Sequence, residues 1–270
     1  MGPLFTDLYQ LTMALGYFAS GKHREEAVFE LFFRRCPFQG EYAVLGGFDL
    51  VKQVIENFKF TENHIAYLKS LPVFKNAPNA FFEELKNLSL DDVEILAIPE
   101  GEIVFAREPL LQVRGPIMKA QLLESALLNA VNFSTLVATC ARRMKMVAKE
   151  NDLVEFGLRR AQGPNGAMTA TRSSYLGGFS ATSNVEAGLD LGIPVVGTMA
   201  HAFVQSFWEL SSSDRDLFRG EDLSHTNQGE LSAFLAYAKV FPSACLLLVD
   251  TYDTLKSGVP NAIRVFKYLS

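Results

Sequence analysis

The sequence predicts an α/β protein, in which an α+β region is followed by part of an irregular, TIM-like α/β barrel. Strand-type apolar runs are mixed with helical patterns up to about residue 115, and one long helical pattern covers residues 116–150. Strand and helix patterns then alternate over residues 151–270. Because such alternation is typical of parallel strands joined by crossover helices, we expect three parts: residues 1–115, a helical connector at 116–150, and a barrel segment at 151–270.

The amino-terminal part is expected to begin with an amphipathic helix over residues 6–20. Leucines recur on one face of this segment, Thr6 can cap its start, and Gly21 follows its end. A second helical stretch covers residues 50–58. Strands are expected at Ala27–Phe33, Ile95–Ile98 and Ile103–Val113. The last of these strands should be bulged or broken, because it contains Pro109.

The long helix is expected to start beside Pro116, since proline is favoured at the first position of a helix. Beyond it, three strands are expected at residues 153–157, 194–198 and 244–250. Helices are expected near residues 173–176, 184–191, 201–208, 230–240 and 259–269. The strands are continuously apolar, so both of their faces should be buried. A closed barrel of eight strands needs ~250 residues, and the sequence therefore supplies only the first part of one.

Composition argues against several classes of function. The 270 residues include 30 acidic and 25 basic side chains, with no Lys/Arg-rich run. Nucleic acid binding depends on clustered positive charge and is not expected. We find no signal-peptide pattern and no apolar run near the ~18 residues of a membrane span, so a cytosolic protein without membrane contacts is expected. Cys36, Cys140 and Cys245 lack metal-binding spacing and are expected to be buried, inert thiols.

Polar residues follow each of the three predicted barrel strands. Arg159 and Arg160 follow the first strand, Thr198 and His201 follow the second, and Asp250 ends the third. In parallel α/β folds the carboxyl ends of the strands meet at one rim. Guanidinium groups bind phosphate or carboxylate, and carboxylates hold hydrated Mg²⁺. The sequence therefore predicts a site for an anionic substrate that can carry magnesium.

A glycine-rich segment at residues 177–184 precedes a predicted helix and contains Ser183 and Asn184. Backbone N–H groups at such a position suit phosphate, although this signal alone is weak. Plain structural interpretations stay open for all of these residues. Paired arginines can be solvated, His201 can simply begin a helix, residues 183–186 (SNVE) fit a capping box, and Asp250 can cap a turn.

Taken together, the segments resemble nicotinate phosphoribosyltransferases, in family order and over nearly the whole chain. The stretches that carry the resemblance are TDLYQLTMALGYF (6–18), FELFFRRCPF (29–38), LLQVRGP (110–116), NFSTLVAT (132–139), FGLRRAQGP (156–164), GGFSATSNV (177–185), PVVGTMAHAFVQSF (194–207) and LLVDTYDT (247–254). The resemblance implies an open-sandwich domain and an irregular barrel of the type II phosphoribosyltransferase kind. It also implies a homodimer with shared active sites.

The resemblance further implies a reaction and residue roles. Nicotinate and phosphoribosyl pyrophosphate would give nicotinate mononucleotide for NAD biosynthesis, with ATP as co-substrate and Mg²⁺ as cofactor. Tyr9 of a neighbouring subunit would stack on the nicotinate ring opposite Phe156, while Arg159 would bind phosphate and Thr198 would hydrogen-bond the substrate. His201 would be the catalytic histidine that ATP phosphorylates.

The further site residues stand on their placement at the predicted rim or in the glycine-rich segment. Asp250 is expected to be catalytic and to bind the metal, and Arg160, Ser183 and Asn184 are expected to bind substrate. The family continues with an arginine-bearing strand, an Ile-Asp-Ser-Gly-Asp motif and a glycine-rich phosphate loop, which this sequence lacks. Two alternatives therefore stay open: an inactive product that only associates with full-length subunits, and a relative specific for nicotinamide or quinolinate.

Overall fold

The computed structural model describes residues 1–269, and the chain divides into two compact units, Met1–Val195 and Val196–Ser270. Each unit has its own hydrophobic core, the first centred on residues 11–131 and the second on residues 199–265. The α/β class predicted from the sequence is confirmed. The domain boundaries near residues 115 and 150 stay predictions. Among the described residues, no helix is both long and apolar enough to cross a membrane.

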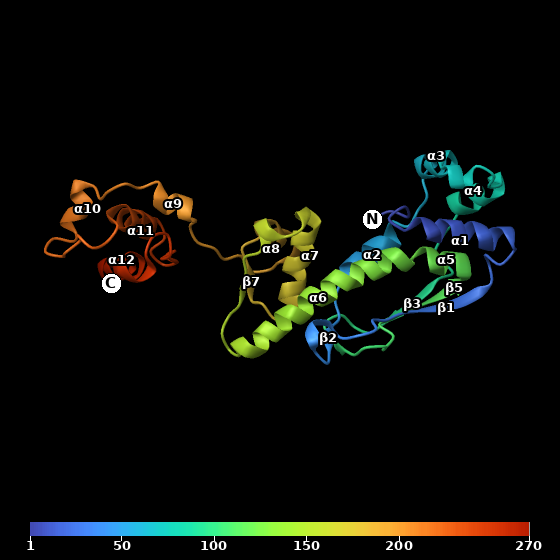
Figure 1. The fold of residues 1–270 in the computed structure, drawn as a ribbon, viewed down its shortest axis with the longest axis horizontal. Helices are drawn as coiled ribbons and strands as arrows, with labels where there is room; N and C mark the ends of the chain where they lie inside the picture. Colours follow the sequence, from blue (N-terminus) through green and yellow to red (C-terminus); the bar gives the residue numbers. More distant parts are fainter. Residues whose placement is uncertain (270) are drawn as a thin grey trace. The chain divides into compact units, whose positions relative to one another are not determined.

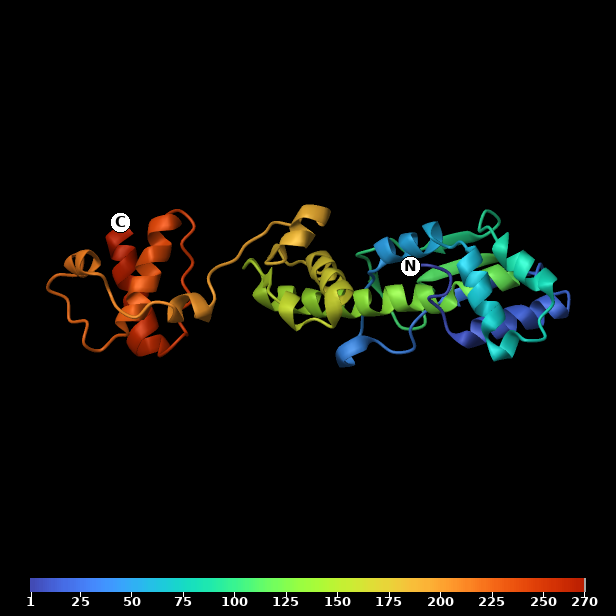
Figure 2. The same ribbon diagram turned by 90° about the horizontal axis from the view of Figure 1, so that it is seen from above.

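The amino-terminal region of the first unit combines short helices with antiparallel strands (Figures 1 and 2). Its elements are α1 (Leu8–Ala19), β1 (Glu26–Leu31), η1 (Pro37–Gln39), β2 (Ala43–Val44), α2 (Phe48–Glu56), α3 (Glu62–Ser70), η2 (Pro72–Phe74), α4 (Asn79–Lys86), β3 (Glu94–Ala97), β4 (Ile103–Val104) and β5 (Leu111–Pro116). The expected helix at 6–20 and the strand at 27–33 are confirmed with slightly shorter bounds. The chain is broken around Pro109, between β4 and β5, as its missing N–H predicted.

A three-stranded sheet of order β1-β5-β3 forms the platform of this region, with both pairs antiparallel. Val113 of the central strand β5 lies between Phe29 of β1 and Ile95 of β3, and it is paired with both. Helix α5 (Ile117–Leu122) packs against β1 and β5, and α1 packs against α5, so α5 covers one face of the sheet and α1 lies on α5 (Figure 1). Strands β2 and β4 form a separate antiparallel pair.

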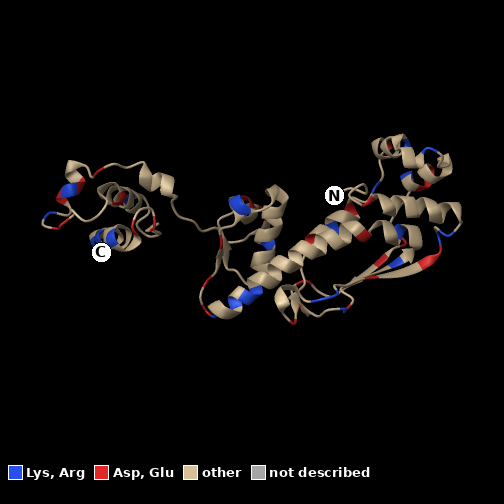
Figure 3. Cartoon of the chain, in the orientation of Figure 1, with Lys and Arg blue, Asp and Glu red and all other residues tan. Residues whose placement is uncertain are grey.

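The expected long helix is present as α5 and α6 (Glu124–Ala148), which meet at Leu123 with the backbone still helical. The buried stripe of α6 consists largely of Ala, Ser and Thr, which lets neighbouring backbone approach closely. The Thr139 hydroxyl accepts a hydrogen bond from the Val44 N–H at 2.9 Å, and Thr135 accepts one from Gly46 N–H at 3.2 Å. Figure 3 shows that Lys and Arg positions gather toward the carboxyl-terminal end of α6, and Lys145 in its last turn complements the helix dipole.

The first unit ends with a small α/β segment. It contains β6 (Val154–Glu155), η3 (Leu158–Arg160), α7 (Gly163–Leu176), β7 (Ala181–Thr182) and α8 (Val185–Leu191). Strands β6 and β7 pair in parallel, and Thr182 forms a further parallel bridge with Val195. This confirms the parallel arrangement predicted from the alternating pattern. Helix α7 packs along α6, which attaches the parallel segment to the rest of the unit.

The second unit is mainly helical in the described residues. It contains α9 (His201–Gln205), α10 (Ser212–Asp216), α11 (Gln228–Val240), the π-helical turn η4 (Thr254–Gly258) and α12 (Val259–Leu269). Its core includes Val204, Phe234 and Val265, from α9, α11 and α12. The helices expected at 230–240 and 259–269 are confirmed.

Two of the three expected barrel strands do not form ladders. Residues 194–198 make only the single bridge at Val195, and residues 244–250 have no strand structure. A ladder needs successive backbone hydrogen bonds to a neighbouring strand, and residues 244–250 form no β-bridge with any described residue, since Thr198 reaches Leu246 only through its side chain. Leu246 is 55% exposed and Val195 47% exposed, so the two-sided burial expected for these segments is wrong.

Three local predictions also need correction. The residue before α1 is Asp7, not Thr6, and it makes no side-chain cap. Asn184, not Ser183, caps α8, because its Oδ1 accepts the Ala187 N–H at 3.2 Å. Asp253, not Asp250, caps the turn that follows the third segment. The three cysteines are free but only half-buried, and burial raises the pKa of the Cys245 thiol.

Candidate functional site

The turn that follows β6 presents an aromatic ring and two guanidinium groups. Phe156 is 46% exposed, and Arg159 and Arg160 are exposed on the short 3-10 helix η3. Neither arginine forms an ion pair with any residue that the structure describes. Phe156 and Arg160 also line a groove of ≈ 370 Å³ against α6. An apolar ring beside unpaired guanidinium groups is suited to a flat, anionic ligand.

The glycine-rich loop before α8 lies beside this turn, because β7 pairs with β6. Ser183 donates its N–H to the Glu155 carbonyl at 3.0 Å, and its side chain is half-buried. Asn184 is 2% exposed, with Oδ1 bound to Ala187 N–H and Nδ2 at 3.4 Å from Thr171 Oγ1. In this structure Asn184 supports the loop from inside, whereas Ser183 is nearer the surface.

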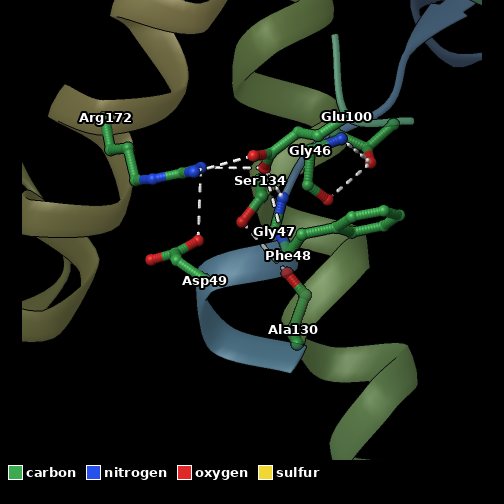
Figure 4. Close-up of polar contacts among 9 residues, drawn as sticks. Gly46, Gly47, Phe48, Asp49, Glu100, Ala130, Ser134 and Arg172 are labelled. Carbon is green, nitrogen blue, oxygen red and sulfur yellow. Dashed lines mark hydrogen bonds and ion pairs between the residues drawn. The ribbon is translucent and has the colours of Figure 1, made fainter. Parts of the chain in front are cut away.

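Helix α7 is held in place by a network of charged groups (Figure 4). Arg172 donates from its two terminal nitrogens to both oxygens of Glu100, at 2.8 and 2.7 Å, and lies 3.2 Å from Asp49. Glu100 also accepts the N–H groups of Gly47 and Phe48, at 2.6 and 3.1 Å, at the start of α2. Burial alone would raise the pKa of Glu100, but the hydrogen bonds from Arg172, Gly47 and Phe48 hold that pKa below its ordinary value.

Tyr9 lies at a second site in the same unit. It is 48% exposed on α1, and its hydroxyl donates to Glu124 Oε1 at 3.1 Å. Tyr9 lines a cavity of ≈ 490 Å³ together with Phe32, Arg35 and Asn132. The cavity combines aromatic, cationic and amide groups, so it can hold a polar aromatic molecule or a segment of protein.

In the second unit, His201 and Asp250 lie close together, and Thr198 contacts the same segment that Asp250 ends. The Thr198 hydroxyl donates to the carbonyl of Leu246. His201 begins α9, with Nδ1 at 3.2 Å from Thr251 Oγ1 and Nε2 at 4.0 Å from Asp250 Oδ1. Both His201 and Asp250 are exposed. The histidine is thus oriented by a hydroxyl on one ring nitrogen and faces a carboxylate with the other.

Within residues 1–269, no group of three or more His, Cys, Asp or Glu side chains could hold a metal ion. Asp250 is a single exposed carboxylate. Such a donor fits Mg²⁺ that keeps most of its water and is bound mainly through substrate phosphates, and it does not fit a metal enclosed by protein.

The structure therefore brings Phe156, Arg159, Arg160 and Ser183 together in the first unit, and His201 and Asp250 together in the second, with Thr198 bound to Leu246. The sequence did not point to Glu155, Thr171 and Thr182, although both threonine hydroxyls donate to the Glu155 carboxylate beneath the β6 turn. An available signal was the single acidic residue in the otherwise apolar run LVEFG.

Comparison with known proteins supports the resemblance found in the sequence. Residues 4–132 match the nicotinate phosphoribosyltransferase (NAPRTase) N-terminal domain family. The chain is 45% identical to nicotinate phosphoribosyltransferase 2 of Arabidopsis thaliana, over 97% of this chain and 52% of that protein. It is 43% identical to the nicotinate phosphoribosyltransferase of Homo sapiens, over 97% of this chain and 54% of that protein.

Solved structures agree. The crystal structure of human nicotinic acid phosphoribosyltransferase matches with a TM-score of 0.87 and 42% identity, covering 98% of this chain and 58% of that one. The nicotinate-nucleotide pyrophosphorylase from Pyrococcus furiosus matches with a TM-score of 0.61 at 20% identity, over 98% of this chain and 61% of that one, which is a likeness of fold alone. The chain spans about half the length of the curated relatives it matches, and its residues 4–132 belong to the nicotinate phosphoribosyltransferase N-terminal domain family.

Proposed function

We propose that this chain supplies nicotinate- and phosphate-binding groups for the synthesis of nicotinate mononucleotide from nicotinate and phosphoribosyl pyrophosphate. The observation that carries the proposal is the β6 turn, where Phe156 and the unpaired Arg159 stand exposed at the carboxyl end of a parallel strand. Relatives named for this activity match over 97% of the chain, which supports the same assignment.

In this proposal the pyridine nitrogen attacks the anomeric carbon of the ribose, and the bond from that carbon to pyrophosphate breaks. Negative charge accumulates on the departing pyrophosphate. Arg159 and Arg160 neutralise anionic groups, while Phe156 packs on the pyridine ring. Ser183 and Asn184 hold the adjoining loop, and Thr198 orients the substrate from its own unit. Positioning of the reactants accounts for most of the catalytic effect.

Mg²⁺, when bound to the pyrophosphate, would stabilise the leaving charge, and Asp250 is the carboxylate that we assign to its hydrated shell. ATP is the proposed co-substrate, and its terminal phosphate would be transferred to His201. Thr251 fixes one nitrogen of that histidine and Asp250 faces the other. The imidazole is therefore already oriented before the phosphate arrives.

A homodimer with shared active sites belongs to the same proposal, with Tyr9 stacking on nicotinate in a neighbouring subunit. Its support is exposed apolar side chains: Phe32 lines the Tyr9 cavity, and Phe32 and Phe29 both line a second cavity. Large exposed apolar patches commonly mark protein interfaces. The cytosolic location expected from the sequence is likewise part of the proposal.

The test is a chromatographic assay of the 270-residue chain with nicotinate, phosphoribosyl pyrophosphate, ATP and Mg²⁺. We expect nicotinate mononucleotide to form, and we expect nicotinamide or quinolinate in place of nicotinate to give no nucleotide product. His201→Ala should abolish the dependence of synthesis on ATP while leaving some uncoupled transfer. Product from nicotinamide alone would contradict the substrate assignment, and no product at all would contradict the activity of this chain.

A further inference from the structure

A carboxylate that has no role in the proposed chemistry lies directly beneath the β6 turn. Glu155, the last residue of β6, accepts hydrogen bonds from three elements. Its Oε2 accepts the Thr171 hydroxyl of α7 at 2.9 Å and the Thr182 hydroxyl of β7 at 2.8 Å. Its Oε1 accepts the backbone N–H of Gly157. It forms no ion pair with any residue in the described part of the chain.

The direction of these hydrogen bonds is fixed by Asn184. Its backbone N–H donates to Thr182 Oγ1 at 3.0 Å, and its Nδ2 lies 3.4 Å from Thr171 Oγ1. Each threonine hydroxyl accepts from Asn184 and is left with its own hydrogen for Glu155. Both threonines are almost fully buried, at 2% and 1% exposure, so neither hydroxyl can turn to water. The Thr171 hydrogen is therefore donated to Glu155 Oε2, and the Thr182 hydrogen is shared between Oε2 at 2.8 Å and the Glu155 carbonyl at 3.4 Å, so a carboxylate at position 155 satisfies both hydroxyls.

Helix α7 provides a fixed base for this network. Thr171 and Arg172 are neighbours on α7, and they bind two different parts of the unit. Arg172 pairs with Glu100 and Asp49 at the start of α2 (Figure 4). Because the contacts of Thr171 and Arg172 lie on different sides of α7, together they fix the rotation of the helix about its axis. The Thr171 hydroxyl is thereby held at Glu155.

The Gly157 contact transmits this order to the turn. A Cβ at Gly157 would lie 2.7 Å from Glu155 Oε1, so the absence of a side chain permits the carboxylate to reach the backbone. Phe156 precedes Gly157, and Arg159 and Arg160 follow it, all within one short turn. A hydrogen bond at Gly157 therefore restricts the backbone from which the aromatic ring and both guanidinium groups extend.

We propose that Glu155 is a positioning residue: its carboxylate, held by Thr171 and Thr182, fixes the turn that places Phe156 and Arg159. The assignment of those two residues to nicotinate and phosphate rests on the proposed function. The positioning itself does not, because it concerns the backbone of the turn in the absence of any ligand. Glu155 touches no substrate in this scheme and acts only through the turn.

Two variants separate the hydrogen bonds from the packing. Glu155→Gln keeps the size of the side chain but replaces one accepting oxygen by an N–H₂ group. In one orientation this donor faces the Gly157 N–H, and in the other it faces the two threonine hydroxyls, so either orientation loses hydrogen bonds. Thr171→Val keeps the shape of threonine and removes its hydroxyl, whereas Thr171→Ser keeps the hydroxyl. Glu150→Gln is the matched control, since Glu150 is exposed and forms no ion pair with described residues.

The measurement is hydrogen–deuterium exchange by mass spectrometry on the 270-residue chain without ligand. In Glu155→Gln and Thr171→Val we expect peptides covering residues 156–160 to exchange about tenfold faster or more, as loss of a charge-assisted hydrogen bond implies. Peptides from α6 should be unchanged, and Thr171→Ser should behave like the unaltered chain. Unchanged exchange at residues 156–160 in both variants would overturn the proposal. Equal acceleration throughout the unit, or no recovery in Thr171→Ser, would overturn it as well.

If the unaltered chain makes nicotinate mononucleotide, steady-state kinetics provide a second test of the positioning role. Both variants should raise the KM for nicotinate and phosphoribosyl pyrophosphate about tenfold or more, and Thr171→Ser should restore it. An unchanged KM beside faster exchange would overturn the positioning role. Failure of the unaltered chain to make product contradicts the proposed function alone, because the exchange experiment still decides the role of Glu155.

Discussion

At the scale of single residues, the start of α2 depends on the absence of a side chain at Gly47. Gly47 adopts a φ of 109° and donates its N–H to Glu100. A Cβ there would lie 2.3 Å from the carbonyl oxygen of Ala130 on α6, a backbone atom that cannot move aside alone (Figure 4). Both the backbone conformation and the close approach therefore require glycine.

We expect Gly47→Ala to lower the free energy of unfolding of the first unit by about 2 kcal/mol or more. Urea unfolding followed by circular dichroism measures this loss. Gly16→Ala is the control, because Gly16 lies inside α1 and a Cβ added there would meet no atom within 4 Å. That control should be neutral or slightly stabilising. Equal effects of the two substitutions would contradict the steric argument.

Glu230 carries a second residue-scale prediction, in the second unit. Its side chain is buried, with Oε2 accepting from Ser257 and Asn261 and Oε1 without a partner among the described residues. Burial raises the pKa of Glu230, and the two hydrogen bonds only partly oppose this. Because the folded-state pKa is raised, protonated Glu230 favours the folded state. This contribution to the free energy of unfolding is complete below the unfolded pKa of about 4.3, and it is lost as the pH rises through the folded-state pKa.

Glu230→Gln should remove this part of the pH dependence, because an amide does not ionise. Exchange rates of peptides from α11, measured between pH 4 and pH 8 and corrected for intrinsic exchange, report it. The unaltered chain should lose protection as the pH rises, and the variant should lose less. Glu209→Gln is the control, as Glu209 is exposed and forms no ion pair with described residues. Identical profiles for the unaltered chain and Glu230→Gln would refute the prediction.

At the scale of elements, Glu100 joins the amino terminus of α2 to α7 through one carboxylate. Its folded-state pKa lies below the ordinary value, so the interaction stabilises fully above about pH 4.3 and is lost as the pH falls through the folded-state pKa. We expect Glu100→Gln to destabilise the first unit by about 1–2 kcal/mol at pH 7. The penalty should shrink in acid.

Urea titrations at pH 7 and pH 3.5 test this, with exposed Glu102→Gln as the control. The difference between the unaltered chain and Glu100→Gln should be larger at pH 7. A penalty that is the same at both values of pH would show that the charge of Glu100 contributes nothing to the junction of α2 and α7.

Elements also show how far the sequence predicts the fold. Helices α1, α6 and α12 follow from apolar periodicity, because each buries one stripe against its own neighbours, whereas α11 is buried on all sides over residues 229–235. The apolar runs at 194–198 and 244–250 predict strands, yet an apolar run specifies only burial. A ladder also needs a partner strand, and that partner is a property of the tertiary structure.

The candidate site divides in the same way. Arg159, Arg160 and Phe156 follow from their place after a strand, which a linear pattern can indicate. The network of Glu155, Thr171 and Thr182 does not, because its members lie 16 and 27 positions from Glu155 in sequence and meet only through folding. The sequence also predicts Ser183 as the N-cap of α8, whereas the structure has Asn184 in that position. Serine and asparagine are both good N-cap residues, so the sequence alone does not choose between them.

At the scale of the whole molecule, the division into two compact units yields the last prediction. The core of the first unit uses residues 11–131, and the parallel pair β6–β7 is bound to α6 through α7. All of the hydrogen bonds that support Glu155 also come from residues before Val195. The interactions that define this unit are therefore contained in Met1–Val195, and residues 1–195 produced alone should fold.

We expect that fragment to show the same exchange protection in α6, α7 and residues 156–160 as the full chain does. Residues 196–270 produced alone should expose apolar surface, because Val196, Leu246 and Leu255 are 42%, 55% and 80% exposed. Such a surface binds hydrophobic dyes and favours aggregation, so this fragment should bind anilinonaphthalene sulfonate. Loss of protection at residues 156–160 in the shorter fragment would mean that the turn needs residues beyond Val195, and the ligand-free order that we assign to Glu155 would then require them too.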